Sequence, residues 1–142
     1  GEADYGAYLN FVHFGEATLT FAQTLVLRYA RFEPPQRRQM GVADDYAKWF
    51  LARLRTLEPR LADTPYLSAG RFTAADVSVG YALLLAQYLG LADRFTPAVA
   101  LYWERLRGRD AFARAMQAQQ AAAEAQGVST VPAPLTLPDE AP

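Results

Sequence analysis

The sequence predicts an all-helical protein of about five helices, a bundle in which two long antiparallel helices pack around a buried core helix. Apolar residues recur at spacings of three and four over most of the chain, and prolines and glycines separate these periodic segments. No segment alternates apolar with polar residues as a strand does. Residues 1–126 are expected to form one helical domain. Residues 127–142 have neither period nor bulk, so we expect an extended or disordered tail there.

The first long helix is predicted over residues 3–31 by a continuous apolar stripe. Its members are Tyr5, Tyr8, Val12, Gly15, Leu19, Ala22, Val26 and Tyr29. Gly15 lies within this stripe although glycine weakens a helix by about 1 kcal/mol, which indicates the close approach of another backbone. His13, Glu16 and Thr20 follow the same spacing beside the stripe, so these polar side chains are expected to share a face.

The second long helix is predicted over residues 42–58, after a bend at Pro34 and Pro35. Pro59 lacks a backbone N–H and should end or kink this helix. The residues expected on its buried side are Val42, Tyr46, Trp49, Phe50, Leu54 and Leu57.

The core helix is predicted to begin at Thr73. The Thr73 hydroxyl is expected to accept from the backbone N–H near Asp76, while the Asp76 carboxylate accepts from the Thr73 N–H, which makes a capping box. Phe72 and Val77 have the spacing of a hydrophobic staple. Residues 77–89 are apolar on nearly every face, so this helix is expected to be buried all round. We therefore interpret Thr73 and Asp76 as structural.

Two shorter helices are predicted after Gly90, which ends the core helix in the left-handed conformation. Thr96 as a cap and Pro97 as the first helical residue begin one of them, and Gly108 ends it. Asp110 is expected to cap the other, which runs to about residue 125.

Composition limits the functions that the chain can have. Its 142 residues suffice for one domain, and a net charge of −1 gives no general attraction to nucleic acid. Without cysteine it has no disulfide and no thiolate nucleophile, and its single histidine, His13, excludes a multi-histidine metal site. No apolar run is long enough to span a membrane and no signal peptide is recognisable, so we expect a cytoplasmic protein without a membrane partner.

Two motifs carry a resemblance to a known family. The first is YL-x-x-G-x-F-T-x-A-D, formed here by Tyr66, Leu67, Gly70, Phe72, Thr73, Ala75 and Asp76. The second is TPAVALYWERLRGRDAFARAMQAQ, with an aromatic–Trp pair in a helix that starts at proline. Over about residues 4–125 the chain resembles the carboxy-terminal, all-helical domain of the glutathione transferases, with Asp110 where the family has proline.

The resemblance implies a division of labour with another domain. In the family, a preceding thioredoxin-like domain binds most of the glutathione and supplies the Tyr, Ser or Cys that stabilises its thiolate. We find no such segment and expect a domain of a longer protein, with no catalytic residue, metal or cofactor of its own. Glutathione is then the co-substrate of the full-length protein. The helical domain is expected to form the pocket for a small apolar electrophile and part of a homodimer interface.

Six residues are candidates for substrate binding under this resemblance: Tyr5, Tyr8, Phe11, His13, Glu16 and Thr20. The three aromatic residues would line the apolar pocket. Glu16 would accept a hydrogen bond from the cationic amine of glutathione, and His13 would donate to its carboxylates. In the alternative interpretation, the aromatic residues belong to the core, and the polar row is a solvated face or lies in the dimer contact.

A second class of function also uses this fold. Some elongation factors and aminoacyl-tRNA synthetases contain glutathione-transferase-like parts that act as non-catalytic protein–protein interaction modules. A neighbouring thioredoxin-like segment would favour the enzyme, and a neighbouring synthetase or elongation-factor domain would favour the module. The near-neutral charge favours the enzyme.

Overall fold

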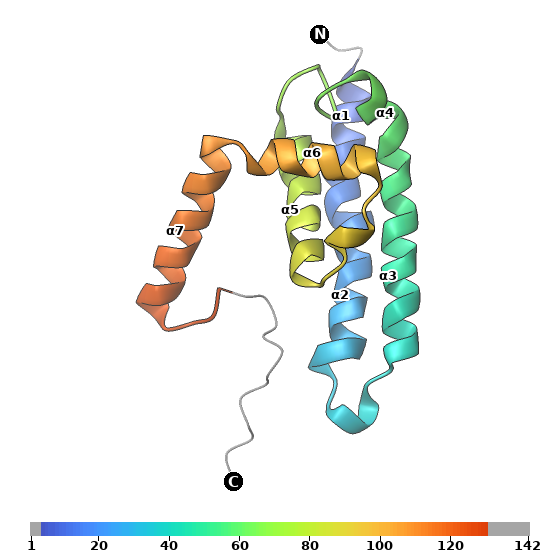
Figure 1. Ribbon diagram of the computed structural model, residues 1–142, viewed down its shortest axis with the longest axis vertical. Coiled ribbons are helices and arrows are strands. Elements are labelled where there is room, and N and C mark those ends of the chain that lie inside the picture. The colour runs from blue at the N-terminus through green and yellow to red at the C-terminus, as the bar shows by residue number, and fades with distance from the viewer. Residues whose placement is uncertain (1–3, 131–142) are drawn as a thin grey trace.

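A computed structural model describes residues 4–130, and these residues are almost entirely helical (Figure 1). No β-strand forms within this range, apart from one isolated bridge between Ser68 and Arg71. The helices are α1 (Tyr5–His13), α2 (Phe21–Leu27), α3 (Met40–Leu54), α4 (Glu58–Asp63), α5 (Ala74–Tyr88), α6 (Pro97–Arg107) and α7 (Asp110–Gln126). The all-helical fold class predicted from the sequence is confirmed.

The two long helices of the prediction are each built from several segments. A π-helical segment, Phe14–Thr20, joins α1 to α2, and a second one, Arg28–Phe32, extends α2. A 3₁₀ turn, Arg55–Leu57, joins α3 to α4, where Pro59 lies in the first turn. Figure 1 shows the two resulting rods antiparallel, with α5 beside the first rod and α6 crossing near one end.

The first rod approaches α5 very closely at Gly15. A Cβ atom on Gly15 would lie 2.3 Å from Ser78 Oγ and 2.5 Å from the Ser78 carbonyl carbon, which is closer than real Cβ contacts. The prediction that Gly15 marks a close backbone approach is therefore confirmed. Two side chains bond to backbone carbonyls here, because Ser78 Oγ donates to the Val12 oxygen at 2.6 Å and Thr20 Oγ1 donates to the Gly15 oxygen at 2.9 Å. These bonds lie where the helix departs from α-helical geometry.

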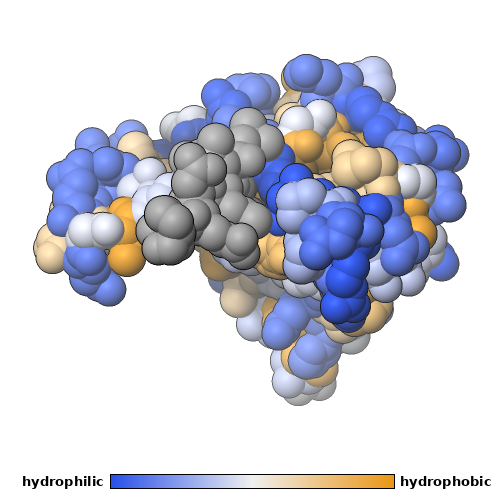
Figure 2. Space-filling view, turned by 90° about the horizontal axis from the view of Figure 1, so that it is seen from below, coloured by the Kyte–Doolittle hydropathy of each residue, from blue (hydrophilic) through white to orange (hydrophobic). Residues whose placement is uncertain are grey.

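The hydrophobic core lies between the two rods, α5 and α6. Its largest fully buried side chains include Leu19, Phe50, Leu54, Leu57, Leu67, Val79, Leu83, Val99 and Tyr102. At the opposite end of the molecule from α6, hydrophilic residues cover most of the surface around the connection between α2 and α3, with small hydrophobic patches between them (Figure 2). No helix within residues 4–130 is long and apolar enough to cross a membrane.

The expectation that the core helix is buried all round is wrong for one side of α5. Ala75, Val79 and Leu83 are fully buried, but Val77 and Tyr81 are each 57% exposed. Periodicity predicted burial on every side because the helix is apolar on every side. Within residues 4–130, however, only the side toward the two rods and α6 is covered.

The helix α6 begins at Pro97 with Thr96 in the cap position, as predicted, although the Thr96 side chain makes no capping hydrogen bond. The start of α7 differs from the prediction. Arg109 has an extended backbone and takes the cap position of α7, so Asp110 is its first helical residue. Gly127 ends α7 with φ of 63°. Most of the tail expected over residues 127–142 lies outside the described residues.

Candidate functional site

The start of α5 is held by a network around the Asp76 carboxylate, which is almost completely buried. Its Oδ2 atom accepts from the Thr73 N–H at 2.8 Å and from the Thr73 hydroxyl at 3.1 Å, and the Thr73 side chain meets the Asp76 N–H in a reciprocal capping box. Its Oδ1 atom accepts from the Leu67 N–H at 3.0 Å and the Tyr102 hydroxyl at 2.8 Å. The capping box therefore also ties α5 to the preceding loop and to α6.

Tyr102 takes part in this network as a neutral donor. Burial raises the pKa of its hydroxyl far above the ordinary value, and the adjacent Asp76 carboxylate raises it further. Tyr102 is fully buried and keeps its proton on the bond to Asp76. The Tyr102 hydroxyl is therefore not available as a base for a bound substrate.

The loop between α4 and α5 is held in place by Asp4. This carboxylate accepts from the Ala69 N–H and pairs with the Arg60 guanidinium, whose Nε donates to the Leu67 oxygen at 2.9 Å. The bond from Ala69 and then the bond from Arg60 lower the pKa of Asp4. Ala69 needs this support because its φ of 55° is unfavourable for a residue with a side chain.

A mixed polar and apolar cavity of about 350 Å³ lies between this loop and the start of α1. Its lining includes the stacked rings of Tyr5 and Tyr8, 6.1 Å apart, together with Arg71 and Thr73. Phenolic hydroxyls, a guanidinium and aromatic faces can together hold a small molecule that has both polar and apolar parts. Of the six substrate-binding candidates, this cavity brings Tyr5 and Tyr8 together.

The other four candidates lie elsewhere. Phe11 is half-buried against the core and packs edge-to-face on Phe14, with ring centroids 6.4 Å apart. His13 and Glu16 are exposed, whereas Thr20 is half-buried and its hydroxyl bonds to a backbone carbonyl. His13 directly precedes the π-helical segment, Glu16 lies within it and Thr20 is its last residue, so the α-helical spacing used to align these three side chains does not apply here.

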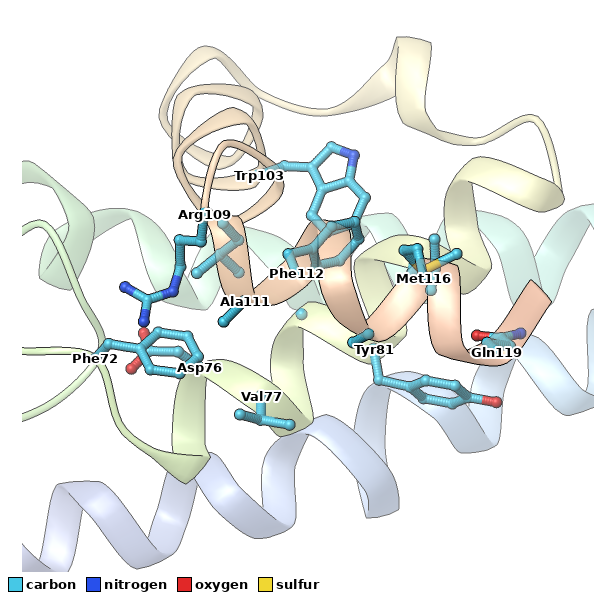
Figure 3. Close-up of a pocket in the computed structure, with 14 residues that line it drawn as sticks. Phe72, Asp76, Val77, Tyr81, Trp103, Arg109, Ala111, Phe112, Met116 and Gln119 are labelled. Atoms are coloured by element: carbon cyan, nitrogen blue, oxygen red, sulfur yellow. The ribbon is translucent and has the colours of Figure 1, made fainter. Parts of the chain in front are cut away.

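A second cavity was not anticipated from the sequence. We call it the α5–α7 groove; it has a volume of about 350 Å³ and is mainly apolar (Figure 3). Tyr81 on α5 and Phe112 and Met116 on α7 line it, and Trp103 on α6 lies beside Phe112. Two sequence signals could have revealed it, because Val77 and Tyr81, like Phe112 and Met116, are apolar pairs four residues apart on a helix.

Arg109 lies at one end of the α5–α7 groove. Its guanidinium carbon is 3.7 Å from the centroid of the Phe72 ring, and its Nη1 atom donates to the Tyr66 hydroxyl at 3.3 Å. Its Nε atom is buried and has no hydrogen-bond partner among the described residues. The groove therefore combines apolar walls with one unused cationic donor.

Neither cavity offers a metal site. Within residues 4–130, no group of three or more His, Cys, Asp or Glu side chains is arranged to hold a metal ion. What the two cavities offer is apolar and aromatic surface with arginine and hydroxyl donors at the edges.

Comparison with known proteins identifies the fold. No protein-family model and no curated protein sequence matches the chain. Among solved structures, it is similar to the glutathione transferase URE2P5 from Phanerochaete chrysosporium, with a TM-score of 0.73 and 23% identity over 87% of this chain and 57% of that one. A structure of Ure2p5 from the same organism, cocrystallized with 1-(S-glutathionyl)-2,4-dinitrobenzene, gives a TM-score of 0.73, 24% identity and coverage of 87% and 59%.

The similarity is one of fold and covers only part of the neighbours. The chain spans less than two thirds of the length of each of these two structures. The match extends over most of the length of this chain. The chain therefore has the all-helical fold of the carboxy-terminal domain of glutathione transferases.

Proposed function

We propose that this chain is the carboxy-terminal domain of a glutathione transferase, which joins the thiol of glutathione to a small apolar electrophile. The observation that carries the proposal is the match of 87% of the chain to glutathione transferases of which it spans 57% and 59%. One of these neighbours was cocrystallized with a glutathione thioether of a dinitrobenzene ring. A product of that class joins a polar peptide to an apolar aromatic group.

In this proposal the chemistry is divided between two domains. A preceding thioredoxin-like domain binds glutathione and supplies the residue that stabilises its thiolate, in a cytoplasmic protein. The helical domain supplies apolar surface for the electrophile, which holds it near the thiolate and excludes water. The aromatic cavity with Tyr5 and Tyr8 supports this role.

We assign the polar candidates on the first rod to glutathione itself. Glu16 and His13 are exposed, so their side chains can reach a molecule held by another domain or subunit. Glu16 accepts from the glutathione amine, and His13 donates to a carboxylate. Thr20 contributes less, because its hydroxyl is occupied by the Gly15 carbonyl.

The proposal includes a homodimer. Leu9 on α1 and Phe21 on α2 are large apolar side chains that are exposed on the first rod. Covering them with a second copy would remove apolar surface from water. Sedimentation velocity of the full-length protein tests this, since Phe21→Glu should shift a dimer toward the monomer.

Isothermal titration of glutathione into this chain and into the full-length protein tests the division of labour. We expect heat of binding only for the full-length protein, because the helical domain alone lacks the glutathione-binding half. Millimolar or tighter binding to this chain alone would overturn the division. No binding to either protein would favour the non-catalytic interaction module.

A further inference from the structure

A third cavity, which we call the cationic cavity, lies between α3 and the start of α6. It has a volume of about 240 Å³, and Leu51, Leu54 and Phe95 form its apolar wall. Figure 1 shows α6 beginning beside α3, and residues of α3 and of the turn before α6 line the cavity together. It shares no lining residue with the α5–α7 groove or with the cavity that contains Tyr5 and Tyr8. The proposed function therefore gives it no role.

Three of the side chains that line the cationic cavity are basic, and no acidic residue of the described chain lines it. Lys48 lies on α3, Arg55 directly follows α3, and Arg94 ends the turn before α6. Lys48 is paired with Asp44 at 2.6 Å and with Asp45 at 3.5 Å, but neither carboxylate lines the cavity. Arg55 and Arg94 form no ion pair with another described residue. Like charges gathered in one cavity repel each other, so an anion between them would be stabilising.

Thr96 adds an unused hydroxyl donor to this cavity. It takes the cap position of α6 but makes no capping hydrogen bond, and its Oγ1 atom is buried without a partner among the described residues. A buried polar atom without a partner is unfavourable, so native structures nearly always provide one. The first backbone N–H groups of α6 also lack acceptors within the helix and favour a negative charge nearby. An anion in the cavity would satisfy both requirements.

We propose that the cationic cavity binds a phosphate group, either as free phosphate or as the monoester of a small apolar molecule. A phosphate monoester carries a charge of about −1.5 to −2 near neutral pH and has three acceptor oxygens. It can therefore accept from the Arg55 and Arg94 guanidinium groups and from the Thr96 hydroxyl at the same time. A carboxylate has one charge and two oxygens, and it would leave part of this donor set unused. The carbon part of an ester would pack on Leu51 and Phe95.

Isothermal titration into the 142-residue chain at constant ionic strength tests the proposal with three probes, which are inorganic phosphate, phenyl phosphate and benzoate. At least one phosphate probe should bind with a Kd of about 1 mM or tighter, and benzoate should bind at least about tenfold more weakly than phenyl phosphate. Tighter binding of phenyl phosphate than of inorganic phosphate would identify an ester as the ligand, and equal binding would identify free phosphate. No binding of either phosphate, or benzoate bound as tightly as phenyl phosphate, would overturn the proposal.

A matched pair of variants locates the binding site. Arg94→Gln removes one guanidinium from the cavity and should weaken phosphate binding about tenfold, the loss expected for one hydrogen bond between charged groups. Arg94 is exposed, so the variant should fold, which far-UV circular dichroism checks. Arg53→Gln is the control, because Arg53 is exposed on α3 and lies outside the cavity, and it should change affinity less than about twofold. Equal losses for the two variants would mean that general charge attracts phosphate, and the cavity would then not be the site.

Thr96→Val tests the hydroxyl with two readouts. Without phosphate, valine should not lower the free energy of unfolding, because the Thr96 hydroxyl has no partner to lose. With phosphate, it should weaken binding about fivefold. Thr64→Val is the control, since the Thr64 hydroxyl lies 3.0 Å from the Arg60 oxygen and 2.7 Å from the Tyr66 oxygen, and valine there should lower stability and leave phosphate affinity unchanged. A loss of stability with unchanged phosphate affinity for Thr96→Val would refute the assignment of this hydroxyl to the anion.

The inference goes beyond the proposed function and does not depend on it. If phosphate fails to bind while the full-length protein binds glutathione, the cationic cavity is not a phosphate site and the proposed function stands. If phosphate binds and Arg94→Gln weakens it while neither protein binds glutathione, the phosphate site stands and the proposed function fails.

Discussion

The two sides of α5 carry similar side chains in different surroundings. On the side toward the first rod, the chains are so close that only glycine fits at position 15, and Ala82 and Leu83 are fully buried. On the groove side, Val77 and Tyr81 are equally apolar but more than half exposed. The sequence therefore shows which sides of a helix are apolar, and the structure shows which of those sides are buried by other elements within residues 4–130.

The largest expected effect is a difference in the free energy of unfolding between substitutions on the two sides of α5. Leu83→Ala should lower the free energy of unfolding by about 2–5 kcal/mol, because it leaves a cavity at a fully buried position. Val77→Ala, on the groove side, should change it by about 0.5 kcal/mol or less. Urea unfolding followed by far-UV circular dichroism measures both. Equal losses would mean that the groove side is as tightly packed as the other side.

The close approach at Gly15 gives the next largest effect. Gly15→Ala should cost about 1–3 kcal/mol of stability, because the new methyl group meets the Ser78 backbone and α5 must shift. Gly6→Ala is the control, since a Cβ atom at position 6 of the chain meets nothing within 4 Å. Alanine there should stabilise the helix by up to about 1 kcal/mol. Urea unfolding measures both variants, and a free energy of unfolding that rises for Gly15→Ala as it does for Gly6→Ala would contradict the tight contact.

Features that depend on near neighbours in the chain could be predicted from the sequence. Thr73 and Asp76, three residues apart, mark the start of the core helix, and Gly90 adopts the left-handed conformation expected after it, with φ of 73°. Gly15 indicated a close contact because a glycine in the apolar stripe of a helix weakens it unless a neighbouring backbone needs the space. These signals sufficed for the fold class.

Features that depend on distant contacts could not be predicted. The π-helical segment Phe14–Thr20 lies where Ser78 bonds to the Val12 carbonyl, a pairing of residues 66 apart in sequence, and it includes Glu16 and Thr20 of the predicted polar row. The α5–α7 groove exists because α7 turns away at Arg109. Periodicity reports which faces are apolar, but not whether another element arrives to cover them.

The KM of the full-length protein for glutathione tests whether the exposed side of the first rod binds this substrate. If Glu16 contacts glutathione there, Glu16→Gln should raise the KM for glutathione about fivefold with little change in kcat, because a charge-assisted hydrogen bond becomes a neutral one. Glu104→Gln, at an exposed carboxylate on α6, is the control and should leave KM unchanged. An unchanged KM for Glu16→Gln would leave this residue as solvated surface.

The smallest expected effect is on the pH dependence of stability, and it concerns Asp4, which holds the loop that leads into α5. Hydrogen bonding by Ala69 and Arg60 lowers the pKa of Asp4, so the folded state favours the ionised carboxylate. The resulting stabilisation is present above about pH 4 and is lost as the pH falls through the lowered pKa. Asp4→Asn should therefore flatten the acid side of the stability profile in urea unfolding at a series of pH values. Asp63→Asn, at the exposed end of α4, should leave the wild-type profile. An Asp4→Asn profile as steep as that of the wild type would mean that this carboxylate does not hold the loop, and the entry to α5 would then depend on the Asp76 network alone.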